Sequence, residues 1–218
     1  RLTTTGEINR SKTITEITEI KERNDFILST IIKINKDSKK KILVLSDRIN
    51  HLETIGNMLD NYNIDYGYYI GKMKQEKLDE SAKKKVILAS YSMASEALDI
   101  PTLNTLLMVT PRSSVEQSVG RILRKKHKHQ SVVVDIVDYF SCFIRQGIKR
   151  RRVYKSCKYD MEVIKVYDSE HTQLNELIEH TKVNTQTFKN SKIKTKKNNL
   201  KTIWCNGKNV KIPKECLI

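Results

Sequence analysis

Glycine is scarce in this 218-residue chain, and none of its seven glycines belongs to a Gly-x-x-x-x-Gly-Lys-Ser/Thr loop, the cradle for a nucleotide's phosphates. The four cysteines include no Cys-x-x-Cys pair, and no His and Cys set has zinc-site spacing, so we expect free thiols and no metal. No apolar stretch approaches the roughly 18 residues that span a bilayer, and the polar start lacks a signal peptide's apolar region. We therefore expect a soluble intracellular protein without a membrane partner. The chain begins with Arg1 rather than Met, so we expect a fragment.

Positive charge is in large excess. The chain has 41 Lys and Arg against 25 Asp and Glu, a formal net charge of +16, which indicates a polyanionic partner such as nucleic acid. The last segment, 182–218, holds ten lysines and a single acidic residue, Glu215. Such a run is typical either of a solvated, partly disordered tail or of a nucleic-acid contact, and both readings stay open.

Short aliphatic runs alternate with helical patterns over the first two thirds of the chain. The runs predict strands at 41–46, 66–70, 85–89, 103–109 and 131–137, and apolar spacing predicts helices at 15–34, 74–84 and 114–126. Parallel strands need long crossover connections, so the alternation indicates an α/β domain with a mostly parallel sheet flanked by helices. We expect a linker at 1–11, this domain at 12–149, and a basic C-terminal extension or small subdomain at 150–218.

Two arginines lie three residues apart in the segment 117–124, which reads QSVGRILR. In a helix, Arg121 and Arg124 lie on one face, and such a pair of guanidinium groups suits the oxygens of a phosphate. An ordinary basic surface helix is the alternative. About twenty residues upstream, a predicted strand ends at Ser90 and is followed by Asp99 and a proline. Ligands of open α/β sheets bind at the carboxyl ends of strands, so this segment predicts either a phosphate and ribose site or a helix cap followed by a turn.

Taken in order, these segments resemble the conserved motifs of the second RecA-like domain of superfamily 2 helicases. Residues 42–48 look like motif IV, 69–73 like the glycine-containing segment after it, 89–101 like motif V and 117–124 like motif VI. The resemblance covers about 42–138. The continuation through Tyr154 is similar to helicases of large cytoplasmic DNA viruses, a group that includes a poxvirus transcript-release helicase.

The resemblance implies a chemistry. In this family ATP binds with Mg²⁺ between this domain and an upstream RecA-like domain, which supplies the phosphate loop and the acidic motif that this chain lacks. It implies that Arg124 is an arginine finger and Arg121 a second γ-phosphate contact. It also implies that Gln117 and Gly120 lie at the nucleotide and that Asp99 holds the ribose or an arginine. The chain alone should not hydrolyse ATP.

The resemblance also implies a nucleic-acid surface near the strand ends, with five contact residues: Ser46, Arg48, Gly71, Lys72 and Ser90. The later basic run, represented by Lys149, Arg150 and Arg151, is either a second contact with phosphates or a plain exposed face. We expect a nucleic-acid substrate, with DNA favoured over RNA, and partner proteins of transcription or repair. The expected location is the host cytoplasm, as for an enzyme of such a virus.

Two other functions fit parts of the sequence. The basic tail alone could make the chain a nucleic-acid-binding module that needs no nucleotide. A scaffolding domain that docks to transcription proteins is the third reading, and it would need neither Arg121 nor Arg124.

Overall fold

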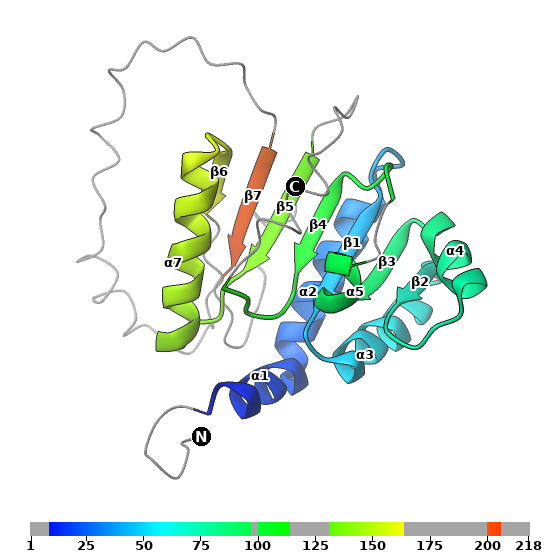
Figure 1. Ribbon diagram of the computed structural model, residues 1–218, viewed down its shortest axis with the longest axis horizontal. Coiled ribbons are helices and arrows are strands. Elements are labelled where there is room, and N and C mark those ends of the chain that lie inside the picture. The colour runs from blue at the N-terminus through cyan, green and yellow to red at the C-terminus, as the bar shows by residue number, and fades with distance from the viewer. Residues whose placement is uncertain (1–8, 97–99, 114–130, 164–199, 206–218) are drawn as a thin grey trace.

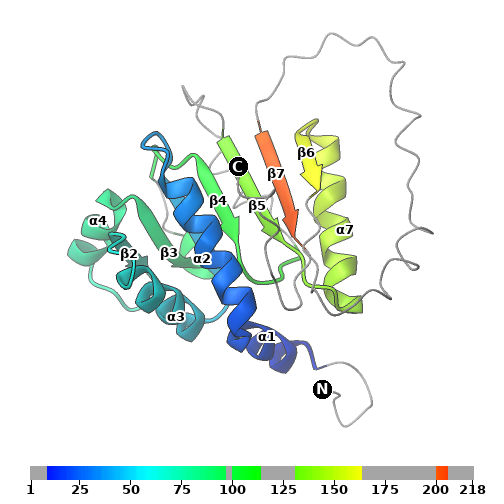
Figure 2. The same ribbon diagram turned by 180° about the vertical axis from the view of Figure 1, so that it is seen from behind.

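The seven described strands run parallel in one sheet. The computed structural model describes residues 9–96, 100–113, 131–163 and 200–205. The sheet has the order β2-β3-β1-β4-β5-β7-β6, and helices lie over both of its faces (Figures 1 and 2). The strands are β1 Ile42–Ser46, β2 Tyr66–Tyr69, β3 Val86–Ser90, β4 Thr105–Met108, β5 Ser131–Ile136, β6 Asp160–Val163 and β7 Leu200–Cys205. The predicted α/β class with a parallel sheet flanked by helices is confirmed.

The central strands are apolar because both of their faces are covered. Every residue of β1 and β4 is buried, and so are the first four residues of β3. Strands covered on both faces show continuous apolar runs in place of alternation, which explains why these runs predicted strands. The structure changes mainly their ends, since the strand predicted at 103–109 begins only at Thr105.

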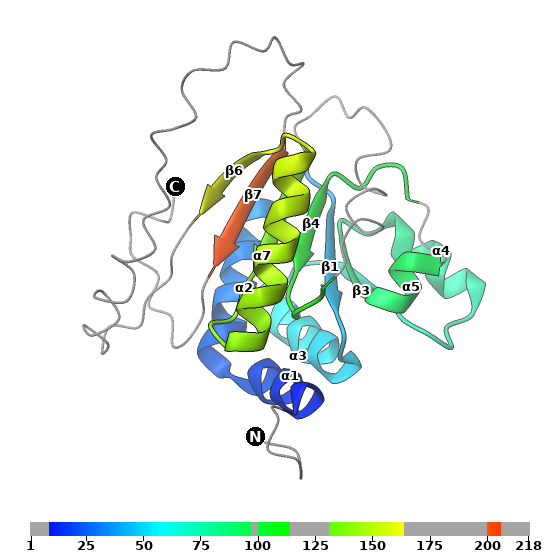
Figure 3. The same cartoon turned by 60° about the vertical axis from the view of Figure 1, so that its left-hand side comes forward.

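The helices form two layers, each with its own apolar cluster. Ile27 and Ile31 of α2 and Leu52 and Ile55 of α3 lie in the cluster on one face of the sheet. Tyr154 of the last described helix belongs to the cluster on the other face, and Figure 3 shows this helix in front of the sheet with α2 behind it. The helix bounds are α2 Lys21–Asn35, α3 Ile49–Asp60, α4 Gln75–Lys83, α5 Tyr91–Glu96 and α7 Ser141–Ser156.

The single long helix predicted at 15–34 is wrong, because the chain forms two helices there, α1 Arg10–Glu19 and α2. Ile20 between them is extended, with φ −69° and ψ 114°. The bend lets Ile14 and Ile17 of α1 pack with Phe143 of α7, while α2 packs on the sheet. One long helix could not bury both stripes, and periodicity within the sequence does not show that the stripes have different partners.

The expected domain boundary at residue 149 falls inside α7. This helix continues to Ser156, and its residues Arg150 and Tyr154 are buried against the sheet. Strand β6 follows directly and joins the same sheet. At the other end, Asn9 caps α1, because its side-chain oxygen accepts a hydrogen bond from the Lys12 N–H at 3.0 Å. The helix expected at 114–126 and most of the basic tail lie outside the described residues. Within the part that is described, no helix has the length and apolar character needed to cross a bilayer.

Two buried Arg–Asp pairs attach helices from opposite faces to β5 and its end. Arg150 of α7 donates two hydrogen bonds of 2.7 Å to Asp135 of β5, and both side chains are at most 2% exposed. Arg23 of α2 donates to Asp138 at 2.6 and 3.0 Å, and both of these side chains are 1% exposed. Removing one partner of such a pair leaves an uncompensated buried charge.

The pair in α7 therefore predicts a large loss of stability in the Arg150→Met variant. Leaving the Asp135 carboxylate without a counter-charge should lower the free energy of unfolding by about 3–5 kcal/mol. Urea denaturation of Arg150→Met and Arg152→Met measures the difference, because Arg152 is exposed on the same helix. Equal effects of the two substitutions would contradict the assignment of Arg150 to the core.

Candidate functional site

Polar side chains gather at the carboxyl edge of the sheet, because parallel strands all end on the same side. Ser46 ends β1 and is followed by Asp47 and Arg48, Ser90 ends β3, and the segment 109–112 follows β4. This is the edge at which open α/β sheets bind their ligands.

The segment 109–112 is held by donors from three helices. Arg23 of α2 donates to the carbonyl of residue 109 at 2.6 Å, and the Tyr91 hydroxyl of α5 donates to that of residue 110 at 3.0 Å. Arg150 of α7 donates to the carbonyl of residue 112. Burial raises the pKa of Tyr91, so this hydroxyl keeps its proton and stays a donor. The chain therefore leaves the sheet on a fixed path just before residue 113.

Arg112 lies at the surface of this segment between two partners. Its guanidinium donates to Asp47 at 3.0 Å and stands 5.1 Å from the centre of the Tyr91 ring. The Arg112 side chain is 45% exposed, so the ion pair adds little stability in water, while the ring restricts where the cation lies. Arg112 was not among the site residues predicted from the sequence. The Pro-Arg pair shortly after a buried strand was the signal that could have found it.

A chain of hydrogen bonds underlies the loop after β1. The Arg48 backbone N–H donates to the Ser46 hydroxyl at 3.1 Å, and this hydroxyl lies 3.1 Å from Nδ1 of His51. Nε2 of His51 lies 2.9 Å from the Asn24 side-chain oxygen, and the Asn24 amide donates to the Thr18 carbonyl at 2.9 Å. Because the Asn24 oxygen can only accept, His51 carries its proton on Nε2 and accepts from Ser46 at Nδ1. Burial and the nearby Arg23 charge lower the pKa of His51 to about 3.

The structure corrects the role predicted for Ser46. Its side chain is fully buried, and its hydroxyl is used in the hydrogen-bond chain to His51, so it cannot contact nucleic acid from this position. Arg48 is instead the part of this loop that reaches the surface. Its guanidinium donates to the Ser11 hydroxyl at 2.9 Å and to the Thr15 hydroxyl at 3.2 Å, which ties the loop to α1.

Arg48 lines a cleft of about 500 Å³ between α1 and the start of α3. Thr15 and Glu19 line it from α1, and Asn50 and Thr54 from α3. The first backbone N–H groups of α3 lie at this end of the cleft. Arg48 is the N-cap residue of α3, and its side chain accepts no hydrogen bond from them. A cation, helix N–H donors and hydroxyl groups together favour an anion.

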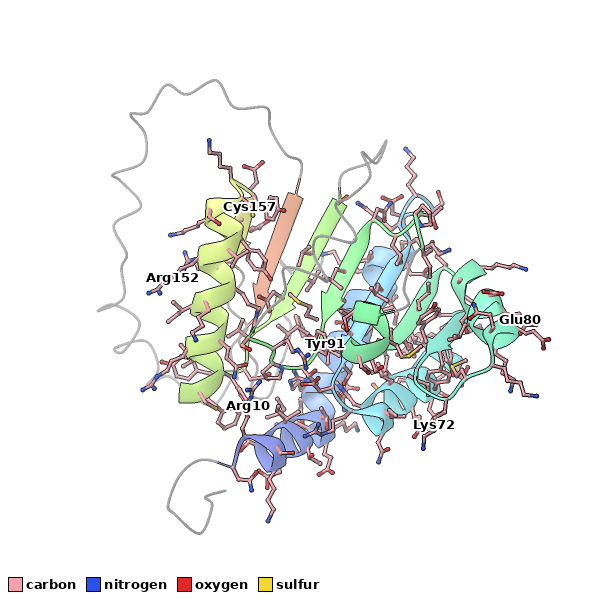
Figure 4. All side chains as sticks on the ribbon, viewed as in Figure 1. Arg10, Lys72, Glu80, Tyr91, Arg152 and Cys157 are labelled. Carbon is pink, nitrogen blue, oxygen red and sulfur yellow. The ribbon has the colours of Figure 1, made fainter. Side chains whose placement is uncertain are left out.

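Lys72 follows β2 and Ser90 ends the neighbouring strand β3, at the other end of this edge. Lys72 is exposed and has a left-handed backbone, with φ 67°, and Figure 4 shows its side chain pointing away from the sheet. Gly71 has no atom within 4 Å of the place where a Cβ would be, so space does not require a glycine there. The Ser90 hydroxyl lies 3.1 Å from the Ser92 hydroxyl and is partly exposed.

The basic run of α7 is divided between core and surface. Arg150, predicted to contact nucleic acid, is buried in its ion pair with Asp135, which corrects that prediction. Lys149 is exposed and Arg151 is half-buried. The predicted nucleotide contacts Asp99, Gln117, Gly120, Arg121 and Arg124 lie outside the described residues. Within the described ranges, no group of three or more His, Cys, Asp or Glu side chains could hold a metal ion.

The chain matches a known protein family. The family model of the helicase conserved C-terminal domain matches residues 12–126, which is more than half of the chain. The chain is a helicase C-terminal domain. The match includes most of α1, the Arg48 loop, the segment 109–112 and both motif VI arginines, and it ends before α7.

Viral relatives support the same family. The helicase domain is 43% identical over 171 residues to an Acanthamoeba polyphaga mimivirus protein assigned as an ATP-dependent RNA helicase. It is 27% identical over 129 residues to a Sulfolobus islandicus filamentous virus protein assigned as a helicase. These alignments cover 76% and 55% of the chain but only 32% and 23% of the relatives, so the chain spans a third or less of their length.

Solved structures share the fold of the helicase domain. T4 UvsW superposes with a TM-score of 0.54 at 24% identity, over 68% of this chain and 35% of that one. The C-terminal part of the Fun30 ATPase domain superposes with a TM-score of 0.50 at 11% identity, over 58% and 44%. Together with the family match and the viral relatives, this shared fold confirms the predicted resemblance to the second RecA-like domain of superfamily 2 helicases.

The buried imidazole predicts a pH-dependent stability. His51 has an ordinary pKa of 6.5 when unfolded and about 3 when folded, so below pH 6.5 the unfolded chain binds more protons. Its contribution is fully present above pH 6.5 and falls as the pH approaches 3, by about 2 kcal/mol at pH 5. Urea denaturation at pH 7 and pH 5 should show a smaller pH effect in His51→Gln than in the natural sequence. Identical pH effects in the two proteins would show that His51 is not held neutral.

Proposed function

We propose that the chain is the second half of an ATP-dependent nucleic-acid helicase or translocase. The segment 109–112 is the observation that carries this function. Three helices hold its carbonyls, and the chain then enters the motif VI sequence with Arg121 and Arg124. A fixed entry suits a group that must meet a phosphate in another domain.

ATP with Mg²⁺ would be held mainly by an upstream RecA-like domain. The sequence has no phosphate loop, and the described residues offer no metal-binding cluster. We therefore propose that this chain contributes one side of an ATP site whose phosphate loop lies in the upstream domain. Arg124 would donate to the γ-phosphate and stabilise the charge that develops there, with Arg121 as a second contact. Gln117, Gly120 and Asp99 would complete the nucleotide side, as the family resemblance implies.

The nucleic-acid-binding surface would follow the carboxyl edge of the sheet. Arg48 in its cleft, Lys72 and Ser90 would contact the backbone of one strand without reading bases. The resemblance to a helicase group that includes a poxvirus transcript-release helicase favours DNA, whereas the mimivirus relative is assigned as an RNA helicase, so both substrates belong in the assays. We also propose an enzyme of the host cytoplasm with transcription or repair proteins as its partners, as the resemblance to helicases of large cytoplasmic DNA viruses implies.

Substitution of the finger tests the nucleotide role. In the full-length protein, Arg124→Ala should lower ATP turnover on the order of a hundredfold, because an arginine at the γ-phosphate contributes at least that much. Lys77→Ala, an exposed lysine of α4, is the control and should leave turnover intact. The present chain alone should show no turnover. Full activity of Arg124→Ala would remove the assignment.

Substitution in the cleft tests the strand role. Arg48→Gln in the full-length protein should weaken binding to single-stranded DNA or RNA and lower the slope of log affinity against log salt by about one unit. Fluorescence anisotropy over a salt titration measures both quantities for each nucleic acid. Unaltered affinity and slope on both would exclude Arg48 as a phosphate contact, and thermal unfolding shows whether its bonds to α1 matter for folding.

A further inference from the structure

Helix α7 presents two chemically different faces. Phe143, Arg150 and Tyr154 are buried against the rest of the domain. The exposed side chains include four cations at spacings of four, three and three residues: Arg145, Lys149, Arg152 and Lys155. Residues at these spacings lie along one side of a helix. We call these four residues the α7 basic face.

The α7 basic face has no compensating charge on its own helix. The sequence of α7 contains no Asp or Glu, and none of the ion pairs in the described part of the chain involves these four cations. Figure 4 shows Arg152 pointing away from the sheet. A cation in the last turn of a helix suits its dipole, which accounts for Lys155 but not for Arg152 or for Arg145 near the start. Like charges at three- and four-residue spacing repel each other, so the row favours an anionic partner.

The α7 basic face is connected through α1 to the proposed nucleic-acid-binding surface at the carboxyl edge. The Arg10 guanidinium at the start of α1 donates to the side-chain oxygen of Gln146, which neighbours Arg145 in α7. The next residue of α1, Ser11, accepts two hydrogen bonds from Arg48. Exposed Arg10 therefore lies between the Arg48 cleft and the first cation of α7.

We propose that the α7 basic face is a second nucleic-acid contact, which holds the phosphate backbone where it leaves the carboxyl edge of the sheet. This inference rests on the proposed function, because it extends the path of the nucleic-acid strand that the carboxyl edge is proposed to bind. It adds a surface that the family match does not include, since that match ends at residue 126. The contact would be with phosphates alone and therefore independent of base sequence.

The shape of the row favours nucleic acid over an acidic protein. Ten residues of helix separate Arg145 from Lys155, which is about 15 Å at 1.5 Å per residue, enough for several successive phosphates. A protein partner would need a buried apolar centre. The exposed side of α7 offers a single large apolar side chain, Ile148, at 42% exposure.

Nucleic-acid affinity of the full-length protein tests the proposal. Binding is measured with a single-stranded oligonucleotide that is long enough to reach both surfaces. The double variant Lys149→Ala with Arg152→Ala should bind it roughly tenfold more weakly. It should also lower the salt slope by about one unit for each side chain removed. Lys77→Ala with Lys83→Ala is the matched control, because both lysines are exposed on α4, on the opposite side of the molecule in Figure 1. The control should bind as the natural protein does. Neither pair lies in the core, so both variants should fold.

Three results would overturn the proposal. The first is an α7 variant with the natural affinity and salt slope, and the second is an equal loss in the α4 control. The third is polyglutamate that binds the natural protein but not the α7 variant, while the oligonucleotide binds both equally, which would identify an acidic protein as the ligand. Loss of ATP turnover in Arg124→Ala does not involve α7, so the proposed function can fail or hold independently of this surface.

Discussion

Two buried arginines from opposite faces of the sheet hold the chain where it leaves the carboxyl edge. Arg23 and Arg150 each bind a carboxylate of β5 or its end and, with the remaining donors, a carbonyl of the segment 109–112. Each guanidinium therefore connects a helix, a strand and the chain that leads into motif VI. A planar fork of five donors can make these contacts at once, whereas a lysine would supply a single point of charge.

Sequence periodicity predicted most of the strands because a doubly covered parallel sheet needs continuous apolar runs. It could not show that Lys149 and Arg150, adjacent in one basic run, face opposite ways, because burial of Arg150 depends on Asp135 in a different element. The break at Ile20 was hidden for the same reason, since apolar spacing does not say which surface a stripe will meet. Tertiary pairing carries this information, and local pattern does not.

The candidate site was likewise predicted only in part from the sequence. Motif resemblance located the edge and its accessible cation Arg48, and it also selected Ser46, whose hydroxyl is used inside the protein. A serine at a strand end can face either a ligand or the core, and only its neighbour His51 decides between them. In this domain the buried serine holds the backbone of the arginine two residues later, whose side chain reaches the surface, where we propose that it contacts phosphates.

Strand β7 has a consequence for how the domain is made. It lies between β5 and β6, although residues 200–205 come last of the three in the sequence. Strand β6 pairs only with β7 among the described strands, so it has no place in the sheet until that late segment arrives. During synthesis, β1 to β5 precede the outer edge, which must wait until the chain has reached β7 at Leu200–Cys205, long after β5 ends at Ile136. Such distant pairings slow folding, so the growing chain exposes the open side of β5 for that interval.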